Sequence, residues 1–233
     1  IKSGRLVANK ESGTPGLLNE AVPLEFTRTL LAQARAYDRD VGAILRAAGF
    51  PFDPLGQDAQ TAFVSREQYS RLCLELIREL GDESGGVMPD VQTPVGTTRL
   101  IALSMINSSN LSSAMHRGIE FNQVCRVRHG AEITNRLLVE EASKEATLSY
   151  LLGDDAPDVQ HSVLCNLAIW VRFSGWLIDQ HIDITSAACA GPKPEFMAGI
   201  RHFFHCPVAF DQPMNSVTFS ARHLEAELTR TEV

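Results

Sequence analysis

The chain has 233 residues, 44% of them hydrophobic, and carries a formal net charge of −7. This composition can bury a substantial core and favours a globular protein, while the acidic balance excludes the basic face with which a chain neutralises nucleic-acid phosphates. No stretch approaches the roughly 18 uninterrupted apolar residues of a membrane span. A cytoplasmic protein without membrane contact is therefore expected.

The N-terminal half is predicted to be helical after a short arm. Residues 1–22 mix Gly, Ser, Lys and Pro without periodicity and predict a flexible segment. A first helix is expected to open at Pro23, and a second one, with Val41 and Leu45 among its apolar positions, is expected to end at Gly49.

The clearest helix start lies in "SREQYSRLCLELIRELGD". Ser65 can cap the helix, Gln68 can complete a capping box three residues later, and Gly81 can end the helix. The "GDESGG" stretch at 81–86 contains acidic residues without the alternating oxygen ligands of a calcium loop, and we interpret it as a solvated turn.

Two further helices are expected after a break rich in Pro and Gly at 87–98. They cover "TTRLIALSMINSS" and "NLSSAMHRGIEFNQV" and join at Asn107 to Asn110. Gly118 inside the second helix costs up to roughly 1 kcal/mol relative to Ala. It therefore suggests that another backbone comes close at this position.

From about residue 130 the apolar period changes from that of a helix to that of a strand. Two antiparallel strands are predicted over 133–139 and 146–152, with a turn at Ser143. A helix over 159–178, with Asp158 as its cap, is apolar over an unusually wide arc, so we expect it to be buried on more than one side.

The last quarter is predicted to add a strand within 181–191, a helix within 194–205 and a β-hairpin that pairs 208–210 with 217–219, followed by one short helical turn. The expected fold class is α+β. A helical N-terminal part precedes a mostly antiparallel sheet, in the order strand-strand-helix-strand-helix-strand-strand, with helices packed on one face.

Catalytic and metal-binding patterns are missing from the sequence. There is no G-x-S-x-G, P-loop, H-E-x-x-H or dinucleotide fingerprint, and the five dispersed cysteines form no C-x-x-C pair. We therefore expect no enzyme, no metal site and no cofactor.

A ligand pocket is the best functional candidate, although plain core packing is the simpler explanation for each residue alone. We expect it between the helices of 98–122, the helix of 159–178 and the inner face of the strand that follows Ser143. The candidate ligand-binding residues are Met105, Met115, His116, Ile119, Asn122, Arg126, Leu148, Tyr150, Trp170 and Phe173.

Several segments together resemble a known family over residues 24–228. The closing stretch "MAGIRHFFHCPVAFDQPMNSVTFSARHLEAEL" resembles the end of the effector-binding (arabinose-binding-like) N-terminal domain of AraC/XylS-type transcription regulators. "FVSREQYSRLCLELIRELGDESGGV" and "PVGTTRLIALSMINSSNLSSAMHRGIEF" resemble upstream parts of the same domain. The residues that carry the closing motif are Cys206, Pro207, Val208, Phe210, Pro213, Asn215, Phe219 and Leu224.

The resemblance implies the sensory half of a bacterial regulator. It implies one effector-binding and homodimerising domain over 23–228, and a linker from 229–233 toward a helix-turn-helix DNA-binding domain that is absent from this chain. Contact with DNA would occur only through that domain. The apolar candidate pocket favours a small apolar or amphipathic effector. A pure dimerisation or protein-interaction module without a ligand is the alternative.

Overall fold

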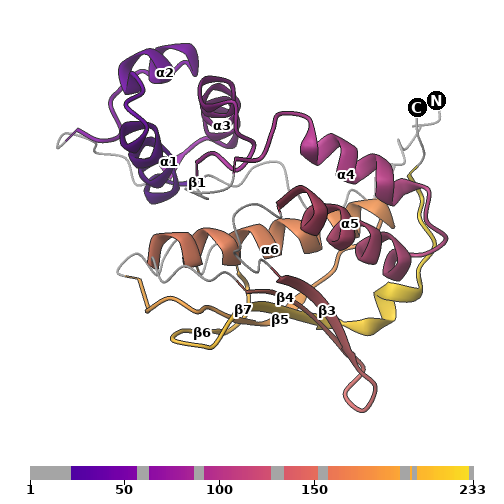
Figure 1. Cartoon of the computed structure of the whole chain (residues 1–233). Coiled ribbons are helices and arrows are strands. Elements are labelled where there is room, and N and C mark those ends of the chain that lie inside the picture. The colour runs from indigo at the N-terminus through magenta and orange to yellow at the C-terminus, as the bar shows by residue number, and fades with distance from the viewer. Residues whose placement is uncertain are drawn as a thin grey trace, which may run out of the picture.

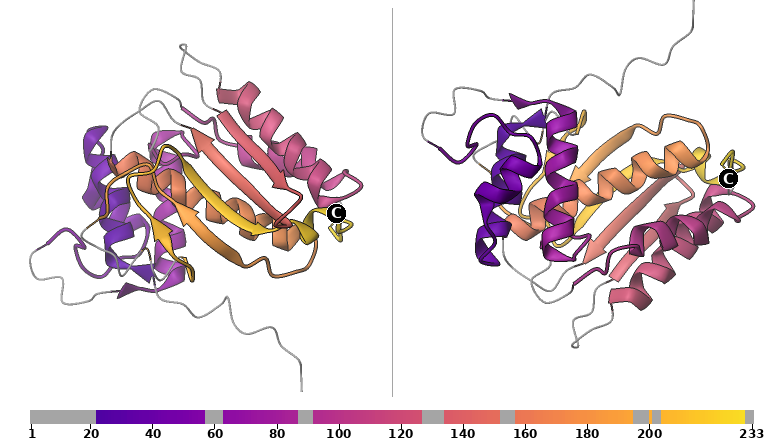
Figure 2. Two further views of the ribbon diagram at one scale, coloured as in Figure 1. Left: turned by 90° about the horizontal axis from the view of Figure 1, so that it is seen from below. Right: turned by 90° about the horizontal axis from the view of Figure 1, so that it is seen from above.

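The computed structural model describes residues 22–56, 63–86, 92–126, 134–151, 157–194, 200 and 204–230. It has the predicted α+β architecture, in which helices cover one face of a five-stranded sheet (Figure 1). Seen from below, the strands lie in front of the helices, so no described helix covers the second face of the sheet (Figure 2). None of the described helices is long and apolar enough to cross a membrane.

Three helices form an N-terminal unit at one end of the sheet layer. They are α1 (Leu24–Ala36), α2 (Val41–Ala47) and α3 (Arg66–Leu80). A short antiparallel pair of strands, β1 (Val22–Pro23) and β2 (Phe63–Val64), fastens the start of α1 to the start of α3. The helices enclose a small apolar cluster of their own, separate from the core over the sheet.

The predicted ends of α3 are confirmed. The Ser65 hydroxyl accepts from the backbone N–H of Gln68, and the Gln68 side chain accepts from the N–H of Ser65, which completes the capping box. Gly81 takes a left-handed conformation with φ of 65° and donates its N–H to the carbonyl of Ile77. These contacts join residues three or four positions apart, so the local sequence is sufficient to specify them.

The two helices predicted after the break are also present, as α4 (Thr97–Ile106) and α5 (Leu111–Arg126). They pack against each other beside the sheet. Gly118 of α5 lies at a close approach, because a Cβ atom there would meet Met105 of α4 and Trp170 of the next helix. The predicted close approach of a backbone is therefore wrong, because the approaching groups are side chains.

The sheet is mixed, with one parallel pair among antiparallel ones. Its strand order is β3-β4-β7-β5-β6, and only β5 and β6 are parallel. The bounds are β3 Thr134–Glu140, β4 Glu145–Leu151, β5 Ile184–Ala188, β6 Val208–Ala209 and β7 Asn215–Ser220. The first predicted hairpin, β3 with β4, is confirmed.

The second predicted hairpin is wrong, because β5 lies between β6 and β7. The residues that resembled a hairpin turn instead carry the chain over the end of β5: the N–H of Asp211 donates to the carbonyl of Gly191, and that of Gln212 to the carbonyl of Cys189. Asp211 adopts a positive φ of 57°, which an aspartate tolerates in a turn. The amino-acid composition of this segment predicted the turn. It did not predict that the connection from β6 to β7 crosses the end of a third strand.

Helix α6 (Pro157–Leu177) crosses the sheet diagonally (Figure 2). A stripe of buried residues, with Leu164, Ala168 and Val171 at spacings of four and three, belongs to the core over the sheet. The helix begins at Pro157 and not after Asp158 as predicted, because the fixed φ of proline suits the first helical position.

The C-terminal part ends as predicted in a short helical turn, η1 (Ala221–Glu225). After it, the carbonyl of Ala226 accepts from the N–H of Leu111 at 2.9 Å, and the N–H of Thr229 donates to the carbonyl of Leu177 at 2.9 Å. These bonds fasten the segment 226–230 to the start of α5 and the end of α6. Most of the helix predicted at 194–205 lies outside the described residues; within it, the buried Ile200 is helical.

Candidate functional site

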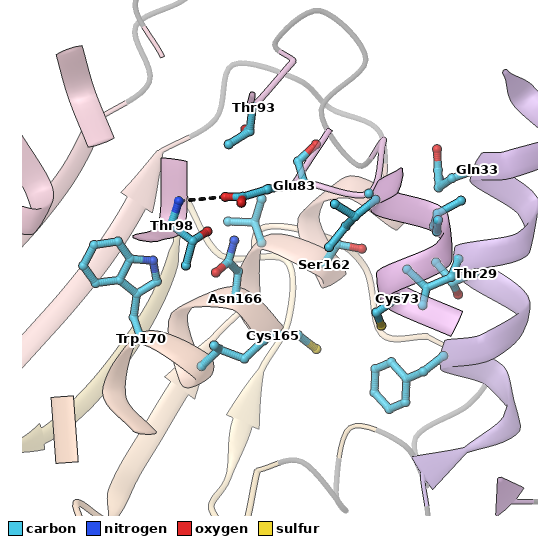
Figure 3. Close-up of a pocket in the computed structure, with 18 of the residues that line it drawn as sticks. Thr29, Gln33, Cys73, Glu83, Thr93, Thr98, Ser162, Cys165, Asn166 and Trp170 are labelled. Carbon is cyan, nitrogen blue, oxygen red and sulfur yellow. Dashed lines mark hydrogen bonds between the residues drawn. The ribbon is translucent and has the colours of Figure 1, made fainter. Parts of the chain in front are cut away.

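A cavity of about 440 Å³ lies between the N-terminal helical unit and α6 (Figure 3). Its walls come from α1, α3, α4, α6 and the segment that joins α3 to α4. The lining residues are Phe26, Thr29, Leu30, Gln33, Tyr69, Cys73, Leu76, Ile77, Glu83, Ser84, Gly85, Thr93, Thr97, Thr98, Ile101, Asn122, His161, Ser162, Val163, Cys165, Asn166, Ile169, Trp170, Phe173 and Ile200. This volume is in the range of small-molecule sites in proteins.

Helix α6 supplies one whole wall of the cavity. Ser162, Cys165, Asn166, Trp170 and Phe173 line it at spacings that repeat every three to four residues, so they share one face of the helix. The other face packs over the sheet. The wide apolar arc therefore covers two surfaces, a core and a cavity. The predicted burial of α6 on more than one side is wrong for the cavity side, because Asn166 and Ile169 are exposed there.

The opposite wall comes from α1 and α3 and is apolar, with weakly ionising groups. Burial raises the pKa of the Cys73 thiol in α3 to about 11, and it raises that of the Cys165 thiol on the facing α6 wall to about 12. Burial, together with the neighbouring Cys73, also raises the pKa of the Tyr69 hydroxyl. All three groups stay protonated near neutral pH, so the two thiols act as small apolar lining and not as nucleophiles.

Two adjacent carboxylates just after α3, those of Asp82 and Glu83, fix the rim of the cavity by accepting hydrogen bonds. Asp82 is 5% exposed and accepts from the backbone N–H groups of Ser84, Gly86 and Thr93 and from the Ser84 hydroxyl, at 2.6 to 3.1 Å. The turn at 81–86, which was predicted to be solvated, is therefore a hydrogen-bonded turn around a buried carboxylate. Four donor groups bond the Asp82 carboxylate in place of the water that it loses on burial.

The side chain of Glu83 extends from this turn to the start of α4. Its carboxylate accepts from the N–H of Gly96 at 2.6 Å and from that of Thr98 at 2.7 Å (Figure 3). Burial alone would raise the pKa of Glu83, but the hydrogen bonds from Thr98 and Gly96 outweigh it and hold the pKa below its ordinary value. The carboxylate thus caps α4 and fixes one edge of the cavity.

The chemical balance of the lining suits a neutral molecule with a large apolar part. Among the described lining residues there is no Lys or Arg, and Glu83 already uses its charge at α4. The Thr93 hydroxyl is buried and has no hydrogen-bond partner among the described residues. The ring nitrogen Nε2 of His161 is already engaged, 2.8 Å from the carbonyl of Pro192.

The structure brings three of the ten candidate ligand-binding residues to this cavity: Asn122, Trp170 and Phe173. Tyr150 instead lines a much smaller chamber next to it. The role of these residues in ligand binding is a prediction.

The other candidates lie elsewhere. Met105, Met115, Ile119 and Leu148 are buried in the core over the sheet. His116 is exposed, and its Nδ1 lies 2.8 Å from the carbonyl of Ser112 in its own helix. The side chain of Arg126 lies outside the described part of the structure.

Sequence reasoning missed the whole wall that α1 and α3 contribute. The apolar stripe of α1, with Phe26 and Leu30, has the spacing of any core-facing helix, so it gave no separate signal. In α3 a weak signal existed, because Tyr69 and Cys73 place a hydroxyl and a thiol four residues apart next to the apolar stripe. Only the packing of the helical unit against α6 makes these residues neighbours.

Comparison with known proteins places the chain in a family. The family model for the arabinose-binding domain of AraC transcription regulators, N-terminal, matches residues 39–228. No curated protein matches the chain. Among solved structures, it is similar to the crystal structure of the transcriptional regulator CdpR from Pseudomonas aeruginosa, with 15% identity and a TM-score of 0.46, over 88% of this chain and 57% of that one. Because the family model spans most of its length, the chain belongs to the family of arabinose-binding N-terminal domains of AraC transcription regulators.

Proposed function

We propose that the chain is the ligand-sensing domain of its regulator and that the cavity against α6 binds a small apolar or amphipathic effector. The observation that carries this proposal is the cavity of about 440 Å³ itself, which two separately packed parts of the molecule enclose. A ligand there would contact both parts at once. Its binding free energy would therefore depend on how they are arranged, as a sensor requires.

The polarity of the lining supports an amphipathic effector over a free sugar or an anion. A sugar would lose hydrogen bonds to water that apolar residues such as Leu30, Ile77 and Ile169 cannot replace. A carboxylate or phosphate would find no Lys or Arg among the described lining residues. A molecule with a long apolar part and few polar groups avoids both costs.

A chain of contacts supports a route from the cavity to the C-terminal segment. Phe173, which lines the cavity, stacks on Trp176 with ring centroids 5.6 Å apart. The guanidinium of Arg230 lies 5.0 Å from the centroid of the Trp176 ring, and its Nε donates to the Trp176 carbonyl at 2.9 Å. We propose that an effector touching Phe173 biases the position of 226–230, and through it a helix-turn-helix domain on the C-terminal side.

The sensor proposal is tested by thermal unfolding of the domain with fractionated small-molecule extracts. An effector at one hundred times its dissociation constant should stabilise the domain by about 2.7 kcal/mol. A Ser162→Trp variant, which fills the cavity from α6, should lose this response. The matched control Ser186→Trp, on an exposed position of β5, should keep it.

Two results would contradict the proposal. If no fraction shifts the melting temperature, the domain functions as a dimerisation or protein-interaction module without a small-molecule ligand. If Ser162→Trp responds as strongly as the wild type, the effector binds outside this cavity.

A further inference from the structure

A second, much smaller chamber lies next to the main cavity, between α5, α6 and the sheet. It measures about 10 Å³, which is the space that a single water-sized group occupies. Three of its lining residues are asparagines, which come from three different elements: Asn122, Asn135 and Asn166. The remaining lining residues are Tyr150, Val163, Leu167 and Trp170.

The main cavity and the small chamber share part of their lining. Asn122, Val163, Asn166 and Trp170 line both spaces. The shared residues border both spaces, so the two spaces are adjacent, and two of the shared residues carry amide side chains. A ligand in the main cavity therefore has a polar group of the small chamber within reach of its end.

Asn135 is the feature of the chamber that packing does not explain. It is 3% exposed, and its side-chain oxygen Oδ1 has no hydrogen-bond partner among the described residues. Its backbone carbonyl, in contrast, accepts from the Gln123 side chain at 3.1 Å. Leaving a buried acceptor without a donor is unfavourable, so such a group calls for an explanation, and a bound ligand or an ordered water supplies one.

Resting on the proposed function, we propose that the three asparagines form a subsite for the terminal hydroxyl of an amphipathic effector, whose apolar part fills the main cavity. A hydroxyl has the size of the chamber and donates the hydrogen bond that Asn135 Oδ1 lacks. The amides of Asn122 and Asn166 supply both donors and acceptors for the hydroxyl oxygen.

Charged end groups fit the subsite poorly. A carboxylate carries two oxygens and no proton to donate at neutral pH, so it would face the oxygen of Asn135 without an attractive contact. An ammonium group would lose its hydration in a chamber whose described lining includes no acidic residue. The site should therefore discriminate between molecules that differ only in the group at the end of the same chain.

The experiment compares two probes of equal chain length, 1-decanol and decanoate, by fluorescence titration. The chain has two tryptophans, Trp170 and Trp176. A Trp176→Phe variant therefore keeps Trp170, which lines both spaces, as the only tryptophan whose fluorescence reports binding. We expect 1-decanol to change the Trp170 emission and to bind at least tenfold more tightly than decanoate at pH 7.

An Asn135→Leu variant in the same background tests the subsite directly. It should lose at least tenfold in affinity for 1-decanol, lose the preference over decanoate and keep or raise the melting temperature, because it removes an acceptor that had no donor. The matched control is Asn215→Leu, since Asn215 is also a buried asparagine in a strand, but its amide is bonded to Gln160 and to the N–H of Ala190. That variant should melt at a lower temperature and keep the preference for 1-decanol.

Three binding or stability results would overturn the subsite, and a fourth, the absence of any binding, would refute it as well. The first three are equal affinity of the reporter protein for both probes, a tenfold preference that survives Asn135→Leu, and a fall in melting temperature for Asn135→Leu as large as that for Asn215→Leu, which would make Asn135 a structural residue. If neither probe binds, the subsite is also refuted. The sensor proposal is then decided separately, by the response of the Ser162→Trp variant to extract fractions.

Discussion

At the scale of a single residue, Gly118 determines how closely the backbone of α5 can approach the side chains of α4 and α6. A Cβ atom at this position would lie 2.7 Å from Sδ of Met105 and 3.0 Å from Cζ3 of Trp170. Both distances are shorter than normal contacts, so one of the two side chains would have to move. Since Trp170 lines the cavity, the glycine also fixes where the indole of the cavity wall can sit.

A Gly118→Ala substitution should therefore destabilise the domain. Alanine gains about 1 kcal/mol in helix propensity, but overpacking a close contact typically costs about 1–3 kcal/mol, and we expect a net loss of about 1 kcal/mol in the free energy of unfolding. Urea denaturation measures it. Gly42→Ala is the control, because a Cβ there would meet the end of the flexible Arg46 side chain in α2; it should be neutral or stabilising. Gly118→Ala at or above wild-type stability would contradict this account.

At the scale of elements, the Glu83 side chain supplies hydrogen-bond acceptors for the start of α4. The first N–H groups of α4 have no partners within the helix, and its N-cap, Gly96, has no side chain to supply one. Glu83, thirteen residues earlier, accepts from the N–H of Gly96 and also bonds that of Thr98. The cap therefore ties α4 to the end of α3 across the rim of the cavity.

This cap predicts a pH-dependent effect of Glu83→Gln. At pH 7 the variant should lose up to about 0.5 kcal/mol of stability, a small value because the carboxylate is only partly buried and solvent screens its charge. The pKa of Glu83 is lowered in the folded state, so its contribution is present above the ordinary glutamate pKa and is lost as pH falls through the folded value. The difference between wild type and variant should therefore shrink below about pH 4.

Chemical denaturation at pH 7 and at pH 3 provides the comparison. Glu120→Gln, an exposed position in α5, is the matched control and should show no such pH-dependent difference. A Glu83→Gln effect of the same size at both pH values would show that the charge of the carboxylate does not cap α4.

For the whole molecule, the division into two buried clusters determines how it can respond to a ligand. The cluster of α1–α3 is small and includes Leu31, Ile44 and Leu72, whereas the other spans the sheet, α4, α5 and α6. The cavity lies between the helical unit and α6, so direct packing between them is reduced there. We expect the helical unit to open locally at a lower free energy than the sheet.

Hydrogen exchange of backbone amides should detect this difference. A Leu72→Ala variant removes a fully buried side chain from the smaller cluster, a change that typically costs about 2–5 kcal/mol. It should speed exchange in α1–α3 while β4 and β7 remain protected. Val217→Ala, at a fully buried position of β7, should instead speed exchange throughout the domain. Uniform acceleration by Leu72→Ala would show that the two clusters unfold as one unit.

The sequence by itself determined the features that depend on neighbouring residues. The capping box at Ser65, the stop at Gly81, the hairpin around Ser143 and the wide apolar arc of α6 follow from contacts three or four residues apart or from the period of apolar side chains. The family resemblance was also contained in ordered local motifs, and the family match over 39–228 confirms it.

The tertiary structure decided whatever joins distant segments. The insertion of β5 between β6 and β7 could not be read from a turn, because a turn sequence does not encode which strand it spans. The cavity wall of α1 and α3, and the missing partner of Asn135, arise where segments that are distant in the sequence meet α6. An apolar stripe is the same whether it faces a core or a cavity, and only the packing of the helical unit against α6 decides which it is.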